Sequence, residues 1–73
     1  MNVGERVFSL MHAEDMVIVA PASPNQIDVY QMLYGLSSYL PFWVVRSVET
    51  SQHYVANEID LVPLSFLEKG DMR

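Results

Sequence analysis

The stretch Phe42-Trp43-Val44-Val45-Arg46-Ser47-Val48 decides the fold of this chain, because it combines aromatic and β-branched residues directly after a proline. Such side chains fit a pleated strand better than a helix. Alternate residues of a strand point to opposite faces. One face carries Phe42, Val44, Arg46 and Val48, and the other carries Trp43, Val45 and Ser47. Both faces are mostly apolar, which predicts an inner strand of a covered or closed sheet.

Further runs of strand character flank this stretch and are separated from it by turn-forming residues: 6–11, 16–20 and 53–56. Polar residues at 12–15 and 49–52 predict two hairpins. The spacing at 57–60 predicts a 3₁₀ turn that leads into a short last strand. Pro63 lies in that strand, and a proline lacks the N–H that a ladder needs, so we expect the strand at an edge of the sheet.

A chain of 73 residues forms one small domain, with an ordered part expected over about 3–67 and a frayed tail over 68–73. Its stability is marginal for its size, so burial of a few apolar side chains is decisive. The residues expected in this core are Val17, Val19, Val44, Val55 and Leu61.

Residues 24–36 are predicted to form a helix between the second and third strands. Ser23-Pro24 is typical of a helix N-cap followed by proline at the first helical position. Apolar residues then form two adjoining helical stripes, namely Ile27, Tyr30, Leu33 and Tyr34 on one and Val29, Met32 and Leu36 on the other. A segment this apolar is also compatible with a strand or a long loop.

Composition excludes several classes of function. The chain has no cysteine, which excludes disulfides, thiolate metal sites and a cysteine nucleophile. Nine acidic residues against four basic ones give a net charge of −5. Nucleic-acid binding requires a basic stripe, so we do not expect it here. No apolar run is long enough to span a bilayer, and we expect a cytoplasmic protein, in the host cytoplasm if it is viral.

The order of these pieces resembles that of SH3-like β-barrels. The resemblance is carried by the opening Val3-Gly4-Glu5-Arg6-Val7, by Trp43-Val44-Val45-Arg46 and by the ending Tyr54 to Leu64, and it covers residues 3–11 and 42–64. It implies a mainly β fold, a small SH3-like antiparallel barrel of four to five strands with a short helix or long loop inserted around 24–36. Small bacterial and phage proteins of this type also suggest an inhibitor or accessory factor that acts on a host protein.

Neither catalysis nor cofactor binding is predicted. The serines include no Gly-x-Ser-x-Gly motif, and the three glycines form no phosphate-binding loop. His12 and His53 lack metal-ligand spacing and are expected at surface turns. Glu58 is expected to cap the turn at 57–60, and Asp60 to accept from free backbone donors there.

One cluster exceeds what a small core needs: large aromatic and methionine side chains crowd the segment that follows the predicted helix start. The predicted interface residues are Tyr30, Met32, Tyr34, Tyr39 and Trp43. The alternative is that these residues are core. We expect a small acidic non-enzymatic protein-binding module whose partner is another protein or a second copy. The alternative function is a structural subunit that forms homo-oligomers without an outside target.

Overall fold

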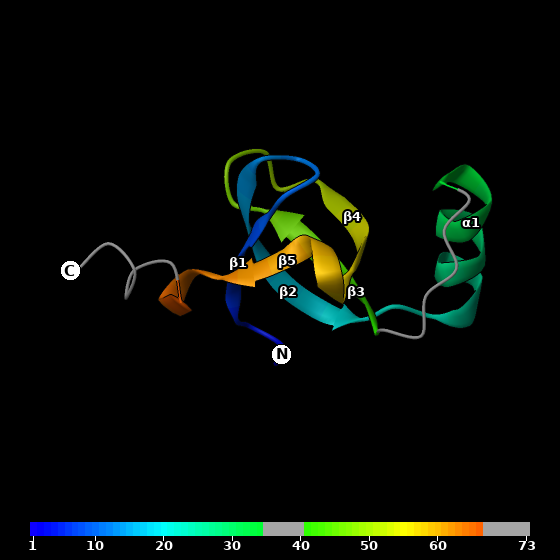
Figure 1. Ribbon diagram of the computed structural model, residues 1–73, viewed down its shortest axis with the longest axis horizontal. Helices are drawn as coiled ribbons and strands as arrows, with labels where there is room; N and C mark the ends of the chain where they lie inside the picture. The colour runs from blue at the N-terminus through cyan, green and yellow to red at the C-terminus, as the bar shows by residue number, and fades with distance from the viewer. Residues whose placement is uncertain (35–40, 67–73) are drawn as a thin grey trace.

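The chain folds into one five-stranded antiparallel sheet, and a helix is inserted in the sequence between the second and third strands (Figure 1). The computed structural model describes residues 1–34 and 41–66. Its elements are β1 (Arg6–Ser9), β2 (Glu14–Pro21), α1 (Pro24–Tyr34), β3 (Phe42–Ser47), β4 (His53–Asn57), the 3₁₀ turn η1 (Glu58–Asp60) and β5 (Leu61–Pro63). The mainly β fold with an inserted helix is therefore confirmed. Residues 35 and 36 of the predicted helix lie outside the described ranges.

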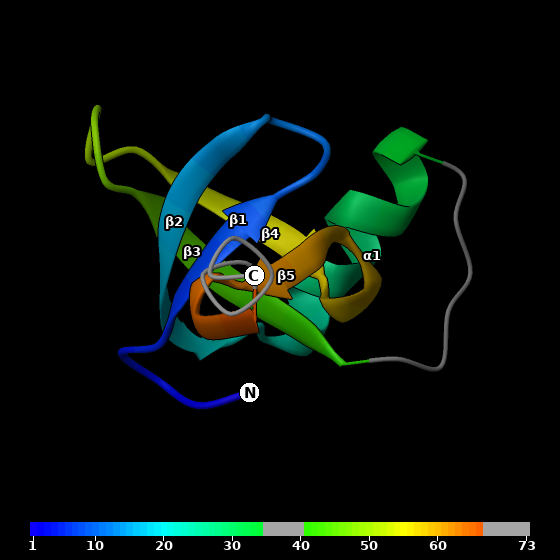
Figure 2. The same cartoon turned by 60° about the vertical axis from the view of Figure 1, so that its left-hand side comes forward.

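The sheet is curled but open. Its strand order is β4-β3-β2-β1-β5, so β4 and β5 are the two edges, and no ladder joins them within the described ranges. The turn η1 carries the chain from one edge to the other, as Figure 2 shows. Of the two expected forms, a covered or a closed sheet, the described residues form an open one. Phe42–Ser47 is an inner strand and Pro63 lies in an edge strand, as the sequence predicted.

The core lies on the concave face of the sheet and draws on all five strands. Its buried members are Val7, Met16, Ile18, Val45, Ala56 and Leu61. Trp43 and Tyr54 pack against this cluster while they stay partly exposed. Every strand of the small sheet therefore contributes an apolar side chain to one cluster, which stabilises the curled shape.

Most of the predicted core was assigned to the wrong face. Leu61 is buried as expected, but Val17, Val44 and Val55 are only half-buried and Val19 is exposed. Side chains alternate with a period of two, so an error of one residue moves a whole strand to the opposite face. In β2, β3 and β4 the inward residues are the neighbours of those predicted.

The exposure of Val19 has a specific cause in the pairing of β2 with β3. Ile18 lies opposite Val45, whereas Ala20 lies opposite Val44, so Val19 is an extra residue that has no partner in β3. This irregularity is a β-bulge, which bends a strand and increases its twist. The bulge adds to the curl of the sheet next to the point where β2 leads into α1.

Both hairpins use the same five-residue turn. The β1–β2 turn begins at Ser9 and the β3–β4 turn at Ser47, and each serine carbonyl accepts a hydrogen bond from the residue four positions later, Ala13 or Ser51. Those two later residues have positive φ angles of 54° and 64°. Each serine hydroxyl accepts from the backbone N–H three residues on, at His12 and Thr50. The side-chain bond fixes the turn without a glycine.

The helix α1 begins with a reciprocal cap. The Ser23 backbone N–H donates to Gln26 Oε1 at 2.8 Å, and the Gln26 N–H donates to Ser23 Oγ at 3.3 Å. This is a capping box, and it supports the predicted helix start. The helix contacts β4, and its buried Tyr30 ring meets Phe42 of β3 edge-on at 5.1 Å. No helix in the described part of the chain is long and apolar enough to cross a membrane.

Candidate functional site

A mostly apolar depression lies between α1 and β4 and has a volume of about 360 Å³. One wall consists of α1 residues, namely Asn25, Gln26, Val29, Tyr30 and Leu33. The other wall and the floor consist of His12, Tyr54 and Val55. We call this depression the α1–β4 groove. Its lining is mostly apolar with a few polar groups, a composition that suits an apolar side chain or ligand.

Three apolar side chains of α1 face solvent around and beside this groove. Val29 is 56% exposed, Leu33 is 71% exposed and Met32 is 83% exposed. The first stripe predicted for the helix is thus divided, because Tyr30 is buried and Ile27 is half-buried while Leu33 is exposed. A single helix on a small sheet can bury only one side, and its other side remains uncovered.

His12 and Tyr54 form the opposite wall. Their rings lie 4.4 Å apart at an angle of 35°, and the Tyr54 hydroxyl donates to Gln52 Oε1 at 2.8 Å. His12 belongs to the β1–β2 turn, whereas Tyr54 belongs to β4, so the curl of the sheet brings them together. The contact holds the wall in place, and nothing in the local sequence around either residue indicates it.

The five predicted interface residues lie in different environments. Met32 is fully available to a partner, but Tyr30 is only 5% exposed and contributes little surface. Trp43 is half-buried and packs against the core. Tyr34 is the last residue of α1, and Tyr39 lies outside the described residues. The groove residues His12, Tyr54 and Val55 were not predicted.

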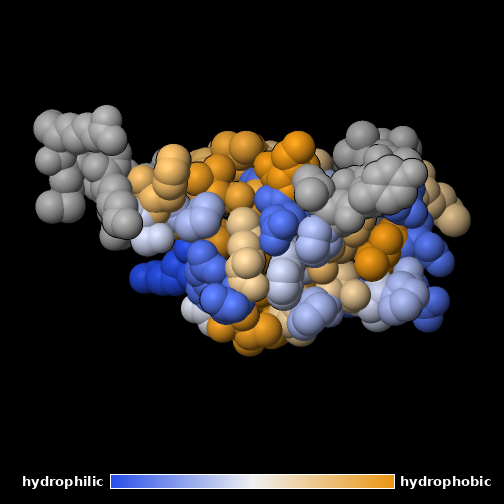
Figure 3. Space-filling model, turned by 60° about the horizontal axis from the view of Figure 1, so that its bottom comes forward, coloured by the Kyte–Doolittle hydropathy of each residue, from blue (hydrophilic) through white to orange (hydrophobic). Residues whose placement is uncertain are grey.

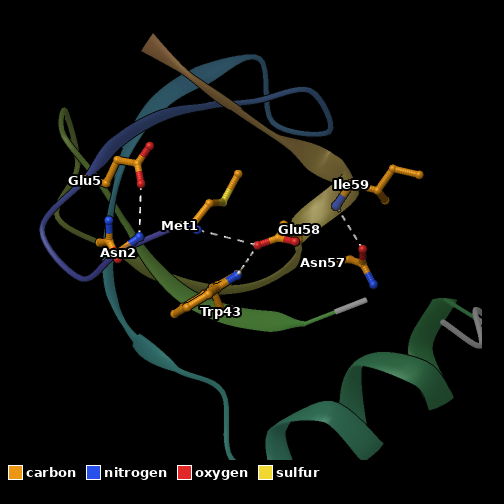
Figure 4. Close-up of polar contacts among 7 residues, drawn as sticks. All are labelled: Met1, Asn2, Glu5, Trp43, Asn57, Glu58 and Ile59. Carbon is orange, nitrogen blue, oxygen red and sulfur yellow. Dashed lines mark hydrogen bonds and ion pairs between the residues drawn. The ribbon is translucent and has the colours of Figure 1, made fainter. Parts of the chain in front are cut away.

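The 3₁₀ turn η1 carries a cluster of polar contacts, which Figure 4 shows. Asn57, not Glu58, caps this turn, because its Oδ1 accepts from the Ile59 N–H at 2.9 Å. Glu58 Oε1 instead accepts from Trp43 Nε1 at 3.3 Å and lies 4.0 Å from the amino group of Met1. These contacts attach the turn to β3, and the expected capping role of Glu58 is wrong.

Asp60 connects the 3₁₀ turn to the first hairpin. Its Oδ2 accepts from Ser9 Oγ at 2.8 Å, and its Oδ1 accepts from the Met11 N–H at 2.7 Å. The expectation that Asp60 accepts from free backbone donors is right, but the donor belongs to the β1–β2 turn and not to the turn at 57–60. Asp60 thus has a structural role beside the strand pairing of β1 and β5.

A second depression, of about 430 Å³, lies between the two hairpin turns and is acidic. It is lined by Phe8, Ala13, Glu14, Asp15, Val48 and Glu49. Glu14 Oε1 is buried and has no hydrogen-bond partner within the described residues. Across residues 1–34 and 41–66, however, no group of three or more histidine or acidic side chains is placed to hold a metal ion.

On the side drawn in Figure 3, hydrophobic residues form separate areas divided by hydrophilic ones. Elsewhere in the described part of the chain Val3, Leu10 and Ile59 are exposed, and they line neither of these two depressions. The α1–β4 groove with its exposed helix residues is therefore the best candidate site. No protein-family model, no curated protein and no solved structure matches this chain.

Proposed function

We propose that this chain is a non-enzymatic protein-binding module that contacts its partner through the exposed apolar side of α1 and the α1–β4 groove. The observation that carries the proposal is the exposure of Val29, Met32 and Leu33 on one helix of a very small domain. Exposed apolar side chains that cluster beside a depression are typical of interaction sites. Methionine is also enriched in such sites.

The acidic character of the chain supports a partner with a basic surface. The net charge is −5, and opposite charges on two proteins raise the rate of their association. A phage-type inhibitor or accessory factor acting in the cytoplasm on a host protein is one such module. This origin and the SH3-like resemblance are further proposals, and the binding function does not depend on them.

The proposal is tested with two matched triple variants. The first carries Val29→Ser, Met32→Ser and Leu33→Ser in α1. The control carries Val3→Ser, Leu10→Ser and Ile59→Ser, which replace side chains that are 62%, 59% and 73% exposed elsewhere. We expect tagged wild-type chain and the control to retain the same protein from a lysate, and the α1 variant to lose it.

Light scattering at two concentrations separates an outside partner from self-association. A monomer supports the proposal. A larger mass that the α1 variant reduces, without a retained protein, supports the alternative of a homo-oligomeric subunit. Retention of the same protein by the α1 variant at the wild-type level contradicts the proposed surface.

A further inference from the structure

The hydrogen bonds at the two ends of the β3–β4 ladder determine which backbone groups of β4 are free. Ser47 N–H donates to the Gln52 carbonyl at 2.8 Å, and Glu58 N–H donates to the Pro41 carbonyl at 2.9 Å. Bonded and non-bonded pairs alternate along an antiparallel ladder. The pair Val44–Val55 is therefore non-bonded, so the N–H and C=O of Val55 point away from β3.

The same alternation applies to His53, which lies opposite Arg46. Its N–H and C=O also point to the free edge of β4. Within the described ranges, no hydrogen bond reaches the outward backbone groups of His53 or Val55. These groups form a short row of donors and acceptors, the pattern that another strand can pair with.

The α1–β4 groove adjoins this row at Val55, which is one of its lining residues. Tyr54 and Val55 are consecutive residues of β4, so their side chains point to opposite faces of the sheet. Both nevertheless line the groove, which therefore extends across the edge of the strand. On one side stands α1 with Val29 and Leu33, and on the other side stands His12. In Figure 1 the helix stands beside the sheet.

The opposite edge of the sheet is protected against pairing. Leu10 N–H donates to the Asp60 carbonyl, so Phe8–Val62 is a bonded pair and Val7–Pro63 is not. The missing N–H of Pro63 therefore falls on the outer side of β5. Proline at this position is a common protection of an edge strand. β4 reads His-Tyr-Val-Ala-Asn and contains neither proline nor lysine.

We infer that β4 accepts an extended segment of a partner protein as an added strand in the α1–β4 groove; this rests on the proposed function and specifies its mode. Addition of a strand at an exposed edge provides affinity through main-chain bonds and specificity through alternate side chains. Here, alternate side chains of the segment would contact Val29 and Leu33 on one face and the His12–Tyr54 pair on the other.

Charge indicates the chemistry of this segment. Among the described residues, no Lys, Arg, Asp or Glu lines the groove, while the chain carries a net charge of −5. A segment that is apolar in its centre and basic at its ends fits both properties. A second copy fits less well, because it carries the same net charge and would bring its own α1 and its own β1–β2 turn into the space between the walls.

The test uses a short fluorescein-labelled peptide of alternating valine and threonine with a lysine at each end. Its control has the same sequence with N-methyl groups on the amides of one edge, which removes the N–H donors and keeps charge and side chains. We expect the first peptide to bind saturably. The second peptide should bind with an affinity at least about tenfold lower. Bound peptide should slow amide exchange at His53 and Val55. Equal affinities, or unchanged exchange at Val55, overturn strand addition.

A pair of variants tests the same edge from the side of the protein. Val55→Pro removes an outward N–H that the β3 ladder does not use, whereas Val55→Ala shortens the side chain and keeps the N–H. We expect Val55→Pro to weaken peptide binding at least about tenfold and Val55→Ala to bind more tightly than Val55→Pro. If Val55→Pro does not fold, the affinities of the two peptides for the wild-type chain decide whether strand addition occurs.

The variants distinguish a failure of strand addition at β4 from a failure of the proposed binding surface. If Val55→Pro folds and still retains the lysate protein that the α1 triple variant loses, the binding module stands and strand addition is wrong. If neither variant changes retention of that protein, the proposed surface itself is wrong.

Discussion

At the scale of single residues, the core depends on which of two adjacent valines in β3, Val44 or Val45, points inward. Val45 is fully buried, whereas Val44 on the other face is half-buried. Removing methyl groups from a fully buried side chain costs transfer free energy and leaves a cavity, because the surroundings relax only partially. The same deletion at an exposed site leaves no cavity.

Val45→Ala should therefore lower the free energy of unfolding by about 1–3 kcal/mol. Val19→Ala is the matched control, since Val19 is 37% exposed at the bulge and should cost less than about 1 kcal/mol. Urea denaturation followed by circular dichroism measures both. Equal losses in the two variants would contradict the assigned face.

A substitution in the β1–β2 turn should stabilise the protein rather than destabilise it. Ala13 adopts a positive φ of 54°, a conformation that costs a residue with a Cβ about 1–2 kcal/mol. Ala13→Gly should raise the free energy of unfolding by up to about 1 kcal/mol, after the larger chain entropy of glycine is subtracted. Ala20→Gly in β2 has no such strain to relieve and should destabilise. Thermal melting of the two variants should shift in opposite directions.

At the scale of elements, the sequence predicted where the strands and the helix lie better than which way they face. Met16, Val17, Ile18 and Val19 are all apolar, so the alternation in this strand carried no information on its inner face. The unpaired Val19 then breaks the period of two. The hairpin at Ser9 was located without its turn type, because the positive φ falls on alanine rather than glycine.

The groove could not be predicted in the same way. Its walls come from the β1–β2 turn, α1 and β4, and the contact between His12 and Tyr54 depends on the curl of the whole sheet. The excess of apolar residues in α1 did indicate exposed surface, and Met32 was identified correctly as exposed. Tyr30 has the same apolar character but turns inward toward Phe42, a difference that composition does not reveal.

The capping box at Ser23 and Gln26 stabilises the first turn of α1. Ser23→Ala removes the oxygen that accepts from the Gln26 N–H, and an uncapped helix loses about 1 kcal/mol. Ser23→Thr keeps the acceptor and should stay close to the wild-type stability. Because α1 contains most of the helical residues, we expect Ser23→Ala to reduce the helical ellipticity at moderate temperature before the sheet melts. If the helical ellipticity is lost only together with the sheet signal, the helix does not melt separately and this prediction is wrong.

At the scale of the whole molecule, the sheet and the helix differ in how firmly they are held. β2 and β3 have a strand on each side and supply fully buried side chains to the core. The helix packs through the buried Tyr30, while its Val29, Met32 and Leu33 are exposed. Regions with few buried apolar contacts open locally at a lower free energy than the core does.

Native-state hydrogen exchange should therefore give lower opening free energies for the amides of α1 than for those of β2 and β3. Low denaturant should leave the α1 values nearly unchanged, since a local opening exposes little new surface. Opening free energies in α1 equal to the global value would show that helix and sheet unfold as one unit. A partner bound in the α1–β4 groove should raise the α1 values.

The pairing of β1 with β5 has a consequence for the order in which the chain folds. The Ser9–Asp60 hydrogen bond joins residues 51 positions apart, and closing a loop of that length costs on the order of 3 kcal/mol in chain entropy. The hairpins β1–β2 and β3–β4 need only short loops and can form early. Contacts of β5 should then be absent from the folding transition state, so substitutions at Leu61 would speed unfolding while they leave the folding rate almost unchanged.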